Sequence, residues 1–346
     1  MMLTERRTAR LTLWLIALIG FAPRFLLASQ IFKYEKAAPE KGFLIQTVPF
    51  EKWLERNYCG PACLAMVLNF WDGAGHFSQR GIAADIYDSE NQATYNSELI
   101  LYPRNKGFVS YSFRGNLRVL KDVVGRNIPV IVLTKTIRQI SKGHYRVVIG
   151  FDEDRDQIIF HDPYFGGRQA MDSGDFLKVW SLGKGHNQFQ WMMVVVPDPS
   201  AFPFPALQND PLTRINLATA YYRRSEFAKS KELWGALRES LSSDPYPLYS
   251  LAMVSLREDK PEEAERYALA AVELDQKSAY AHDVLGLAYA KQDRYFEALR
   301  SLGQAVRLAP DEGFILNHYR QVRALYVERA RLESVQRKEN ADGKTR

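Results

Sequence analysis

Residues 58–68 read YCGPACLAMVL, and this stretch determines how the first half of the chain is interpreted. Its apolar residues recur at helical spacing and continue to Trp71, which predicts a helix that begins near Cys59. Pro61 suits the first helical turn, where no backbone N–H is required. A cysteine at that end of a helix faces unpaired N–H groups and the positive end of the helix dipole, and both stabilise its thiolate. Cys59 is therefore the predicted nucleophile.

The second cysteine, Cys63, lies one helical turn after Cys59 and is predicted to point into the helix packing as a small buried hydrophobe. With only 2 Cys in the chain, a disulfide framework is excluded. A bond between these two residues stays open as an alternative for an oxidising compartment, although a spacing of four residues within one helix fits disulfide geometry poorly.

A nucleophilic cysteine needs a general base, and the base needs an orienting partner. His144 begins the strand-like run GHYRVVIGF (143–151), and the next strand-like run ends at His161 and Asp162. In an antiparallel hairpin the start of one strand lies beside the end of the next, so Asp162 can reach the ring of His144. The spacing therefore predicts a Cys59–His144–Asp162 constellation. His161 alternates to the opposite face and is the weaker candidate for the base.

The same part of the chain leaves a metal site open as an alternative. Cys59, Cys63, His144 and His161 could form a Cys₂His₂ set, a ligand combination of structural zinc sites. Their spacings match no zinc pattern, and the two histidines alternate to different faces of the expected hairpin. We therefore predict no metal and no cofactor.

The region 42–196 mixes helix and strand signals. The pattern from Gly60 to Trp71 and the run 116–124 are typical of helices. The later strand-like runs are 129–133, 146–151, 157–160 and 190–196, and several are short, β-branched and bounded by Gly, Asp or Pro. Helices first and a series of strands later favour an α+β domain with an antiparallel sheet.

Residues 197–211 read PDPSAFPFPALQNDP, with five prolines in fifteen residues. Proline lacks a backbone donor and cannot sit inside a helix or a central strand. This stretch is therefore predicted to be a linker that contains neither element.

Beyond residue 211 the pattern is helical only, and it repeats every 34 residues. The clearest copy is DVLGLAYAKQDRYFEALRSLGQAVRLAP (283–310). Equivalent positions carry matching apolar or small residues, such as Leu217, Leu251 and Leu285; Ala218, Ala252 and Gly286; and Ala264 and Ala298. This period, with small residues where paired helices cross, is the tetratricopeptide signature and predicts an all-α solenoid of about three repeats over 212–332. Residues 314–332 are expected to form the closing helix and 333–346 a disordered tail.

The first 30 residues have the features of an export signal. Arg6, Arg7 and Arg10 precede twelve apolar residues, 11–22, which is the length of a signal-peptide core and too short to span a bilayer unaided. The arginines are expected to stay on the cytoplasmic side. Residues 1–30 are therefore predicted to be a signal peptide or a retained inner-membrane anchor. The remainder is predicted to be periplasmic, either soluble or held at the membrane by this segment.

The charge of the chain is concentrated at its ends. The formal net charge is +6, of which +3 lies in residues 1–30 and +2 in residues 334–346. The main part of the chain is therefore nearly neutral, and no nucleic-acid partner is predicted.

Four segments, in this order, resemble the double-glycine leader peptidase family, whose members are papain-like cysteine peptidases. The segments are YCGPACLAMVL (58–68), GRNIPVIVL (125–133), GHYRVVIGF (143–151) and FHDPYFGG (160–167). The resemblance implies that Cys59 is the nucleophile, His144 the general base and Asp162 the residue that orients the imidazole. It also implies an acyl-transfer reaction on a peptide bond. The best-known members trim leaders after a Gly-Gly pair inside a transporter, and that substrate class does not carry over.

One position departs from the family pattern. The resemblance implies a glutamine five or six residues before the cysteine, whose amide donates to the oxyanion, but Leu54 and Trp53 occupy those positions. Loss of one oxyanion donor costs on the order of 100- to 1000-fold in rate. Asn57 is the candidate replacement, and the backbone N–H of Cys59 acting alone is the other interpretation.

These patterns together predict an exported cysteine peptidase that acts on a peptide or protein substrate. The repeats are predicted to bind a protein partner or to bring substrate to the site. The alternative is a peptidase-like domain with weakened catalysis that serves as a protein-binding module. The departure at the glutamine position is what keeps this alternative open.

Overall fold

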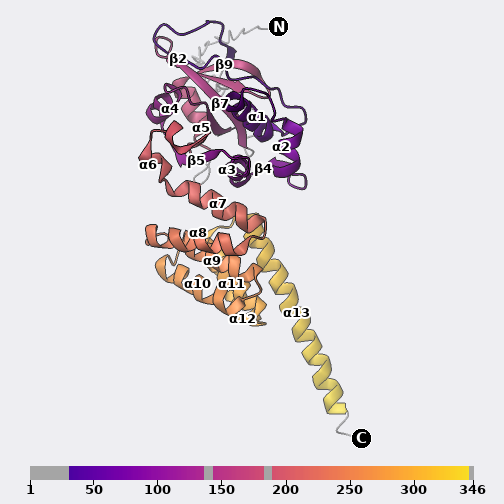
Figure 1. Ribbon diagram of the computed structural model, residues 1–346. Helices are drawn as coiled ribbons and strands as arrows, with labels where there is room; N and C mark the ends of the chain where they lie inside the picture. The colour runs from indigo at the N-terminus through magenta and orange to yellow at the C-terminus, as the bar shows by residue number, and fades with distance from the viewer. Residues whose placement is uncertain (1–30, 136–142, 183–188, 343–346) are drawn as a thin grey trace, which may run out of the picture.

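The computed structural model describes residues 31–135, 143–182 and 189–342. The expected signal or anchor segment, residues 1–30, lies outside the described residues. An α+β region is followed by a stack of helices, and the last helix projects away from that stack (Figure 1). The predicted order of an α+β region and an all-α repeat region is therefore confirmed.

Most of the elements predicted for the first region are present. Its strands are β1 (Phe32–Lys33), β2 (Gly42–Leu44), β3 (Tyr87–Asp88), β4 (Ala93–Thr94), β5 (Val109–Arg114), β6 (Val130–Lys135), β7 (Gly143–Asp152), β8 (Gln157–Asp162), β9 (Gly166–Asp172) and β10 (Trp191–Val196). Its helices are α1 (Cys59–Asp72), α2 (Gln79–Ile86), α3 (Asn96–Asn105), α4 (Leu117–Val124) and α5 (Ser173–Trp180). The two predicted helices correspond to α1 and α4, and the four strand-like runs correspond to β6, β7, β8 and β10.

One antiparallel sheet supports the α+β region. Its strands follow the order β1-β9-β8-β7-β6-β10-β5, and β2 pairs with β7. Because β7 lies between β6 and β8, the start of β7 and the end of β8 are in the interior of the sheet. In the β7–β8 hairpin Val147 pairs with His161, which places Asp162 beside the start of β7. The hairpin predicted from the sequence is confirmed.

Helix α1 packs on the sheet at β7 and is also contacted by α2 and α3. Every residue from Cys59 to Leu68 is buried, because this part of the helix is apolar around its whole circumference. Gly60 makes the packing possible, since a Cβ at this position would lie 2.8 Å from the Thr94 side chain. The start of α1 is therefore enclosed between the sheet and the β3–β4 hairpin.

The stretch 197–211 is not the unstructured linker that its prolines predict. It contains a short 3₁₀ helix, Pro199–Ala201, and the one-turn helix α6, Pro205–Gln208. Phe202 between them is fully buried and stacks on Tyr111 of β5. The prediction of no helix was wrong, because proline prevents a helix from continuing but favours its first turn.

The first helix of the repeats, α7 (Pro211–Arg223), packs against the open edge of the sheet at β5. Thr213 Oγ1 accepts the backbone N–H of Ser112 and donates to its carbonyl, both at 3.0 Å. Asn216 donates to the Ser112 hydroxyl, also at 3.0 Å. Side chains of α7 thus occupy hydrogen-bonding groups of an edge strand that would otherwise be exposed.

A charged contact fixes the other end of α7 to the α+β region. Arg224 donates two hydrogen bonds to the buried Glu98 of α3, at 3.0 and 2.7 Å. Arg223 lies over the ring of Tyr95 at 3.7 Å and donates to Asp88 at 3.1 Å. One hydrophobic core continues from the sheet into α7, α8 and α9. The two regions therefore share a continuous core and specific polar contacts, rather than being joined by the 197–211 segment alone.

The repeats consist of helix pairs followed by a closing helix. The helices after α7 are α8 (Phe227–Ser240), α9 (Tyr246–Arg257), α10 (Pro261–Leu274), α11 (Ala279–Lys291), α12 (Tyr295–Leu308) and α13 (Gly313–Asp342). The small residues of the 34-residue period are fully buried at the helix crossings, as Ala218, Ala252 and Ala298 show. Gly286 permits the closest approach, since a Cβ there would lie 2.5 Å from Leu302.

Helix α13 continues well beyond the stack (Figure 1) and ends at Asp342. The tail expected to be disordered from residue 333 is thus helical as far as the structure describes it. Its polar composition suggested disorder, but an isolated polar helix can be supported by ion pairs one turn apart. Arg329 and Glu333 form such a pair at 3.3 Å.

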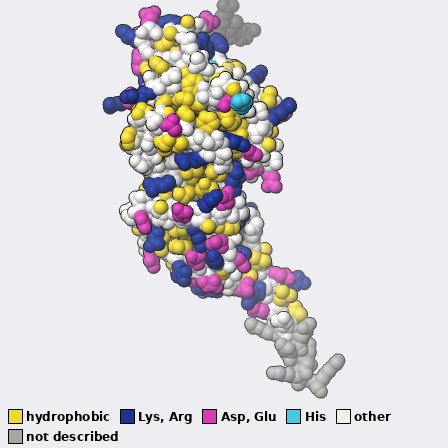
Figure 2. All heavy atoms as spheres, viewed as in Figure 1, with side chains coloured by type: hydrophobic (Ala, Val, Ile, Leu, Met, Phe, Trp, Pro, Cys, Tyr) yellow, Lys and Arg dark blue, Asp and Glu magenta, His cyan; other side chains and the backbone are white. Residues whose placement is uncertain are grey.

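Within the part of the chain that the structure describes, no helix has the length and apolar character required to cross a membrane. On the face drawn in Figure 2, hydrophobic side chains gather on the α+β region, whereas charges of both signs are mixed over the repeats. On this face, the surface chemistry therefore differs between the two regions.

Candidate active site

Cys59 is the first residue of α1 and is 8% exposed. The helix begins after Tyr58, which makes no side-chain cap, so the first-turn N–H groups have no capping oxygen from that residue. The sulfur is hydrogen-bonded to the backbone N–H of Tyr145 and to the ring of His144. The predicted nucleophile therefore lies at a helix N-terminus with donors around it.

His144 is the second residue of β7, and its two ring nitrogens face different partners. Nε2 lies 2.9 Å from Oδ1 of Asp162, which leaves Nδ1 for the Cys59 sulfur. The residue is 5% exposed, and Trp53 packs edge-on against its ring with the centroids 6.0 Å apart. The structure brings the three predicted side chains together in the order Cys59, His144, Asp162.

Asp162, the last residue of β8, is fully buried and accepts hydrogen bonds on both oxygens. Oδ1 accepts from His144 and from the backbone N–H groups of Tyr164 at 2.8 Å and Phe165 at 3.1 Å. Oδ2 accepts from Nε of Arg146 at 2.7 Å. Donors to both oxygens, two of them on cations, stabilise the ionised carboxylate in spite of its burial.

The charges of these groups shift one another's protonation. Burial raises the pKa of the Cys59 thiol, but the hydrogen bond to His144 and the positive ring hold that pKa below its ordinary value. Burial lowers the pKa of His144, but the negative charge and hydrogen bond of Asp162 raise it to about 9. Burial raises the pKa of Asp162, but the charges of His144 and Arg146 hold it far below its usual range. These directions favour a thiolate–imidazolium pair at neutral pH.

Arg146 was not among the residues predicted from the sequence. Its fully buried guanidinium binds Asp162 through Nε and donates from Nη1 to Oγ1 of Thr134. Thr134 in turn donates to the backbone carbonyl of His144 at 3.0 Å. The available signal was a charged residue two positions after His144 in an otherwise apolar strand, since alternation places both on one face.

His161 points away from this group, as predicted. Its Nε2 donates to the backbone carbonyl of Val48 at 3.1 Å, and its Nδ1 accepts the backbone N–H of Arg168 at 2.9 Å. Burial lowers the pKa of His161 to about 4, so its ring is neutral at physiological pH. Both ring nitrogens are therefore occupied, and His161 serves neither as base nor as a ligand.

In the described residues, the candidate ligands and the two cysteines are not arranged as the metal and disulfide alternatives require. Among the described residues, no group of three or more His, Cys, Asp and Glu side chains is arranged to hold an ion. Cys59 and Cys63 are both free thiols. Cys63 is fully buried, and burial raises its pKa well above the ordinary value. The four candidate zinc ligands are not brought together, because His161 is engaged elsewhere.

Asn57, the predicted oxyanion donor, lies two residues before Cys59. Its φ of 70° falls in the left-handed region, which asparagine tolerates better than most residues. Its side chain is hydrogen-bonded to the hydroxyl of Tyr87, whose ring packs against Tyr58 at 4.8 Å. An oxyanion role for Asn57 stays a prediction, because its side-chain amide already makes a hydrogen bond to Tyr87.

Three aromatic residues border the site beside His144 and Asp162, and we call them the aromatic lip: Trp53, Tyr164 and Phe165. Trp53 contacts His144 and Tyr164, and Tyr164 contacts Phe165, with ring centroids 4.9–6.0 Å apart. The backbone N–H of Trp53 donates to the carbonyl of Pro163 at 3.1 Å, which joins the two segments of the lip. Tyr164 and Phe165 are 41% and 43% exposed. The sequence did not predict this surface.

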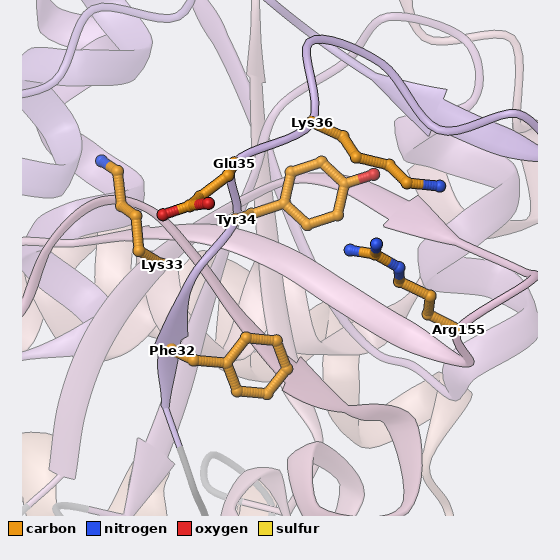
Figure 3. A pocket seen from close by; sticks show the side chains of 6 residues that line it. All are labelled: Phe32, Lys33, Tyr34, Glu35, Lys36 and Arg155. Atoms are coloured by element: carbon orange, nitrogen blue, oxygen red, sulfur yellow. The ribbon is translucent and has the colours of Figure 1, made fainter.

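A separate cavity of ≈ 330 Å³ lies at β1, away from these residues. Figure 3 shows its lining: Phe32, Lys33, Tyr34, Glu35, Lys36 and Arg155. The hydroxyl of Tyr34 donates to the buried Asp152 at 2.9 Å. None of the candidate catalytic residues contributes to this cavity, so it is not the candidate active site.

Two segments of the chain match known families. Residues 45–186 match the Peptidase_C39 like family, and residues 279–312 match the tetratricopeptide repeat. The first segment contains Cys59, His144 and Asp162. The chain is thus similar to C39-like cysteine peptidases in its α+β region and to tetratricopeptide proteins in its helical region, and the resemblance stated from the sequence is confirmed.

Several solved structures are similar to parts of the chain. The peptidase domain of Streptococcus ComA, a bi-functional ABC transporter of a quorum-sensing pathway, is 20% identical over 44% of this chain and 99% of that one, with a TM-score of 0.35. The Sgt2 tetratricopeptide domain from Aspergillus fumigatus is 19% identical over 37% of this chain and 84% of that one, with a TM-score of 0.34. The first such domain of Spaghetti (RPAP3), bound to an HSP90 peptide, is 17% identical over 34% and 95%, with a TM-score of 0.32. No curated protein sequence matches the chain.

Proposed function

We propose that this protein hydrolyses peptide bonds, with Cys59 as nucleophile, His144 as general base and Asp162 as the orienting carboxylate. The observation that carries the proposal is the unbroken series of contacts from the Cys59 sulfur through both nitrogens of His144 to Asp162. A merely structural cysteine would be surrounded by apolar atoms, whereas this sulfur is held by two hydrogen-bond partners at a helix N-terminus.

The first half of the proposed reaction is acylation. The Cys59 thiolate attacks the carbonyl carbon of the substrate, and His144 donates its Nδ1 proton to the leaving amine as the C–N bond breaks. The amine departs and the acyl group remains on sulfur as a thioester. Because Asp162 binds Nε2–H, the neutral ring that results carries its free lone pair on Nδ1.

The second half is hydrolysis of the thioester. Neutral His144 takes a proton from water through Nδ1 as the water oxygen attacks the thioester carbon. The C–S bond then breaks, which releases the carboxylic acid product and restores the thiolate–imidazolium pair. Asp162 needs no change of protonation in either half, since its role is to hold the ring and stabilise its positive charge.

The oxyanion is assigned to the backbone N–H of Cys59 with the amide of Asn57 as a second donor. An amide nitrogen carries two donors, so Asn57 can keep its bond to Tyr87 and still present an N–H. Trp53 occupies one of the two expected glutamine positions and packs on His144 instead. Asn57→Ala is expected to lower kcat on the order of 100-fold, because one oxyanion donor is lost.

We propose that the repeats bind a protein partner or the substrate itself. Their match to the tetratricopeptide repeat supports this, as do the core and polar contacts that join α7 to the α+β region. Thr94 lies against Gly60 at the start of α1, and the guanidinium of Arg223 in α7 lies over the ring of the next residue, Tyr95. These contacts connect the repeats to the helix that begins at Cys59. A polypeptide held on the repeats would therefore keep a constant position relative to Cys59.

The aromatic lip indicates a preference for substrates with an apolar residue on the amine side of the scissile bond, the side that departs during acylation. The base must lie on the side of the departing amine to protonate it, and the lip contacts that base. Exposed aromatic side chains that gather at one place generally mark a binding surface. We therefore expect large apolar residues directly after the cleaved bond.

We further propose that the protein acts in the periplasm, soluble or anchored by residues 1–30. The support is the arginine-rich start followed by twelve apolar residues. Cell fractionation of a C-terminally tagged chain tests this, and intact protein in the cytosolic fraction would contradict it.

Cleavage of a denatured protein substrate, followed by mass spectrometry of the products, tests the proposed activity. Cys59→Ala is expected to abolish cleavage, whereas the matched variant Cys63→Ala is expected to retain it, because Cys63 is fully buried and its raised pKa keeps it a neutral thiol. Cleavage that survives in Cys59→Ala would refute the assignment. An inert wild-type chain that still captures a partner would instead favour the binding module, the function that Trp53 and Leu54 at the glutamine positions suggest.

A further inference from the structure

Arg146 is a charged side chain in a place where packing alone does not require one. It is 0% exposed, its guanidinium lies over the Phe160 ring at 5.4 Å, and its Nη2 has no hydrogen-bond partner among the described residues. Moving a cation from water into the interior is costly, and apolar residues of similar volume are often at least as stable there. Its position therefore calls for an explanation beyond stability.

We propose that Arg146 is a positioning residue for the Cys59–His144 pair, which it serves by anchoring Asp162 and neutralising the charge of that carboxylate. This inference rests on the proposed function, because it concerns the reactivity of the same sulfur. Arg146 touches neither the sulfur nor a substrate, so it acts through other residues.

The geometry shows what Arg146 anchors. Three donors converge on Oδ1 of Asp162, but among the described residues only Arg146 binds Oδ2. Without it, one oxygen of a fully buried carboxylate would lack a partner, and the group could turn about its Cβ–Cγ bond. Arg146 also reaches the backbone of His144 through Thr134, so it restrains both ends of the His144–Asp162 contact.

The charges show what Arg146 neutralises. The titratable and charged groups of the cluster are Cys59 and Cys63 from α1, His144, Tyr145 and Arg146 from β7, and Asp162 from β8. With the thiolate formed and Cys63 and Tyr145 neutral, negative and positive charges alternate from Cys59 through His144 and Asp162 to Arg146. The cluster then has no net charge, although it is almost completely buried.

Loss of the guanidinium charge is expected to disfavour the thiolate, whether Asp162 then stays ionised or takes up a proton. If Asp162 stays ionised, its unbalanced negative charge raises the pKa of Cys59. If Asp162 takes up a proton, His144 loses its anionic partner and stabilises the thiolate less. Both cases shift the pH at which Cys59 becomes reactive upward, by on the order of one pH unit.

The test uses Arg146→Gln, which can still donate to Oδ2 but carries no charge, against Arg146→Lys, which keeps the charge. Both variants are made in the full chain with Cys63→Ala, so that only Cys59 can react. The measurement is the second-order rate of alkylation by iodoacetamide from pH 5 to pH 10, with near-ultraviolet circular dichroism as the check on folding. This readout requires no peptidase activity.

The expected result is an upward shift of the reactive limb by about one pH unit in Arg146→Gln and by less than about a third of that in Arg146→Lys. Identical profiles for the parent and both variants would overturn the proposal, and so would equal shifts in both variants, which would indicate packing rather than charge. If the parent itself reacts as an ordinary thiol near pH 8.5, the proposed function fails first.

A second pair of variants keeps the inference testable if Arg146→Gln does not fold. Thr134→Val removes the hydroxyl that joins Arg146 to the carbonyl of His144, and Thr134→Ser keeps it. Alkylation of Cys59 at pH 7 is expected to be several-fold slower in Thr134→Val than in Thr134→Ser. Equal rates in these two variants would overturn the role of Arg146.

Discussion

Replacement of Asp162 by asparagine tests two contributions of its buried carboxylate to stability, the ion pair with Arg146 and the raised pKa of His144. The variant keeps an oxygen for His144 and for the backbone N–H groups of Tyr164 and Phe165, but it removes the negative charge. Arg146 is then left as an uncompensated cation with 0% exposure. Breaking a buried ion pair on one side costs about 3–5 kcal/mol of unfolding free energy.

The second consequence depends on pH. In the wild type the pKa of His144 is raised from 6.5 to about 9, so its protonated form is stabilised in the folded state. This difference corresponds to about 3 kcal/mol. Because the folded pKa exceeds the unfolded one, the contribution is complete below about pH 6.5 and is lost as the pH rises through about 9. Asp162→Asn is expected to remove the larger part of it, because Cys59 also raises the pKa of His144, though by less than Asp162 does.

The assay is urea unfolding of the wild type and of Asp162→Asn at pH 6 and at pH 9.5. The difference in unfolding free energy is expected to be largest at pH 6 and to shrink at pH 9.5 by up to about 3 kcal/mol, while the cost of the unpaired Arg146 persists at both values. A deficit that is the same at both pH values would refute the coupling between Asp162 and His144.

Asp152→Asn provides the matched control. Asp152 is also fully buried and lies at the opposite end of β7, where it accepts the Tyr34 hydroxyl at 2.9 Å and the backbone N–H of Arg155 at 3.1 Å. No histidine is among these partners, and burial raises the pKa of Tyr34 to about 12. The destabilisation caused by Asp152→Asn is therefore expected to be equal at pH 6 and pH 9.5.

Three further predictions concern packing, the junction and the substrate. Gly286→Ala is expected to destabilise the repeats by about 1–3 kcal/mol in thermal unfolding, because its Cβ would lie 2.5 Å from Leu302. Gly303→Ala is the control and is expected to be neutral or stabilising, because its Cβ would meet nothing closer than 3.8 Å. Glu98→Gln is expected to cost about 1.5–3 kcal/mol in urea unfolding through the lost charge of the Arg224 contact, and no change would contradict a junction stabilised by this contact. Trp53→Ala is expected to raise KM several-fold for peptides with a large apolar residue after the cleaved bond while leaving Cys59 alkylation unchanged, and an unchanged KM would exclude the aromatic lip as a substrate surface.

The catalytic candidates could be predicted because their arrangement is local in the fold. The helix start at Cys59 follows from the apolar spacing and from Pro61, and the structure places α1 there. The contact of His144 with Asp162 follows from a single antiparallel hairpin, whose register is constrained by strand alternation. The approach of Cys59 to this hairpin was predicted from the need of a nucleophilic cysteine for a base, and the family resemblance implied the same three residues.

Arg146 could not be predicted from the same patterns. Hydrophobic patterning assigns charged residues to the surface, because their burial is costly without a partner. The partner of Arg146 is an aspartate on the next strand, and that aspartate had already been assigned to His144. Recognising that one carboxylate serves two cations requires the positions of both oxygens, which the sequence does not specify.

The relation between the two regions was also beyond the sequence. Five prolines indicated a linker without helix or strand, but the contacts that hold it in place are made with residues far away along the chain. Thr213 binds the edge of β5 at Ser112, and Phe202 is buried against the same strand. Side-chain contacts between residues about 100 positions apart leave no local periodicity, and composition alone therefore predicted too much freedom.

We infer that the Cys59 sulfur is ionised near neutral pH because His144 is its partner. The direct measurement is the rate of iodoacetamide alkylation of Cys59 against pH, in a Cys63→Ala background, with His144 present and with His144→Ala. We expect a reactive limb below pH 8.5 with the histidine and a limb above that value without it, because burial alone raises the thiol pKa. Two coincident limbs near pH 8.5 would contradict it.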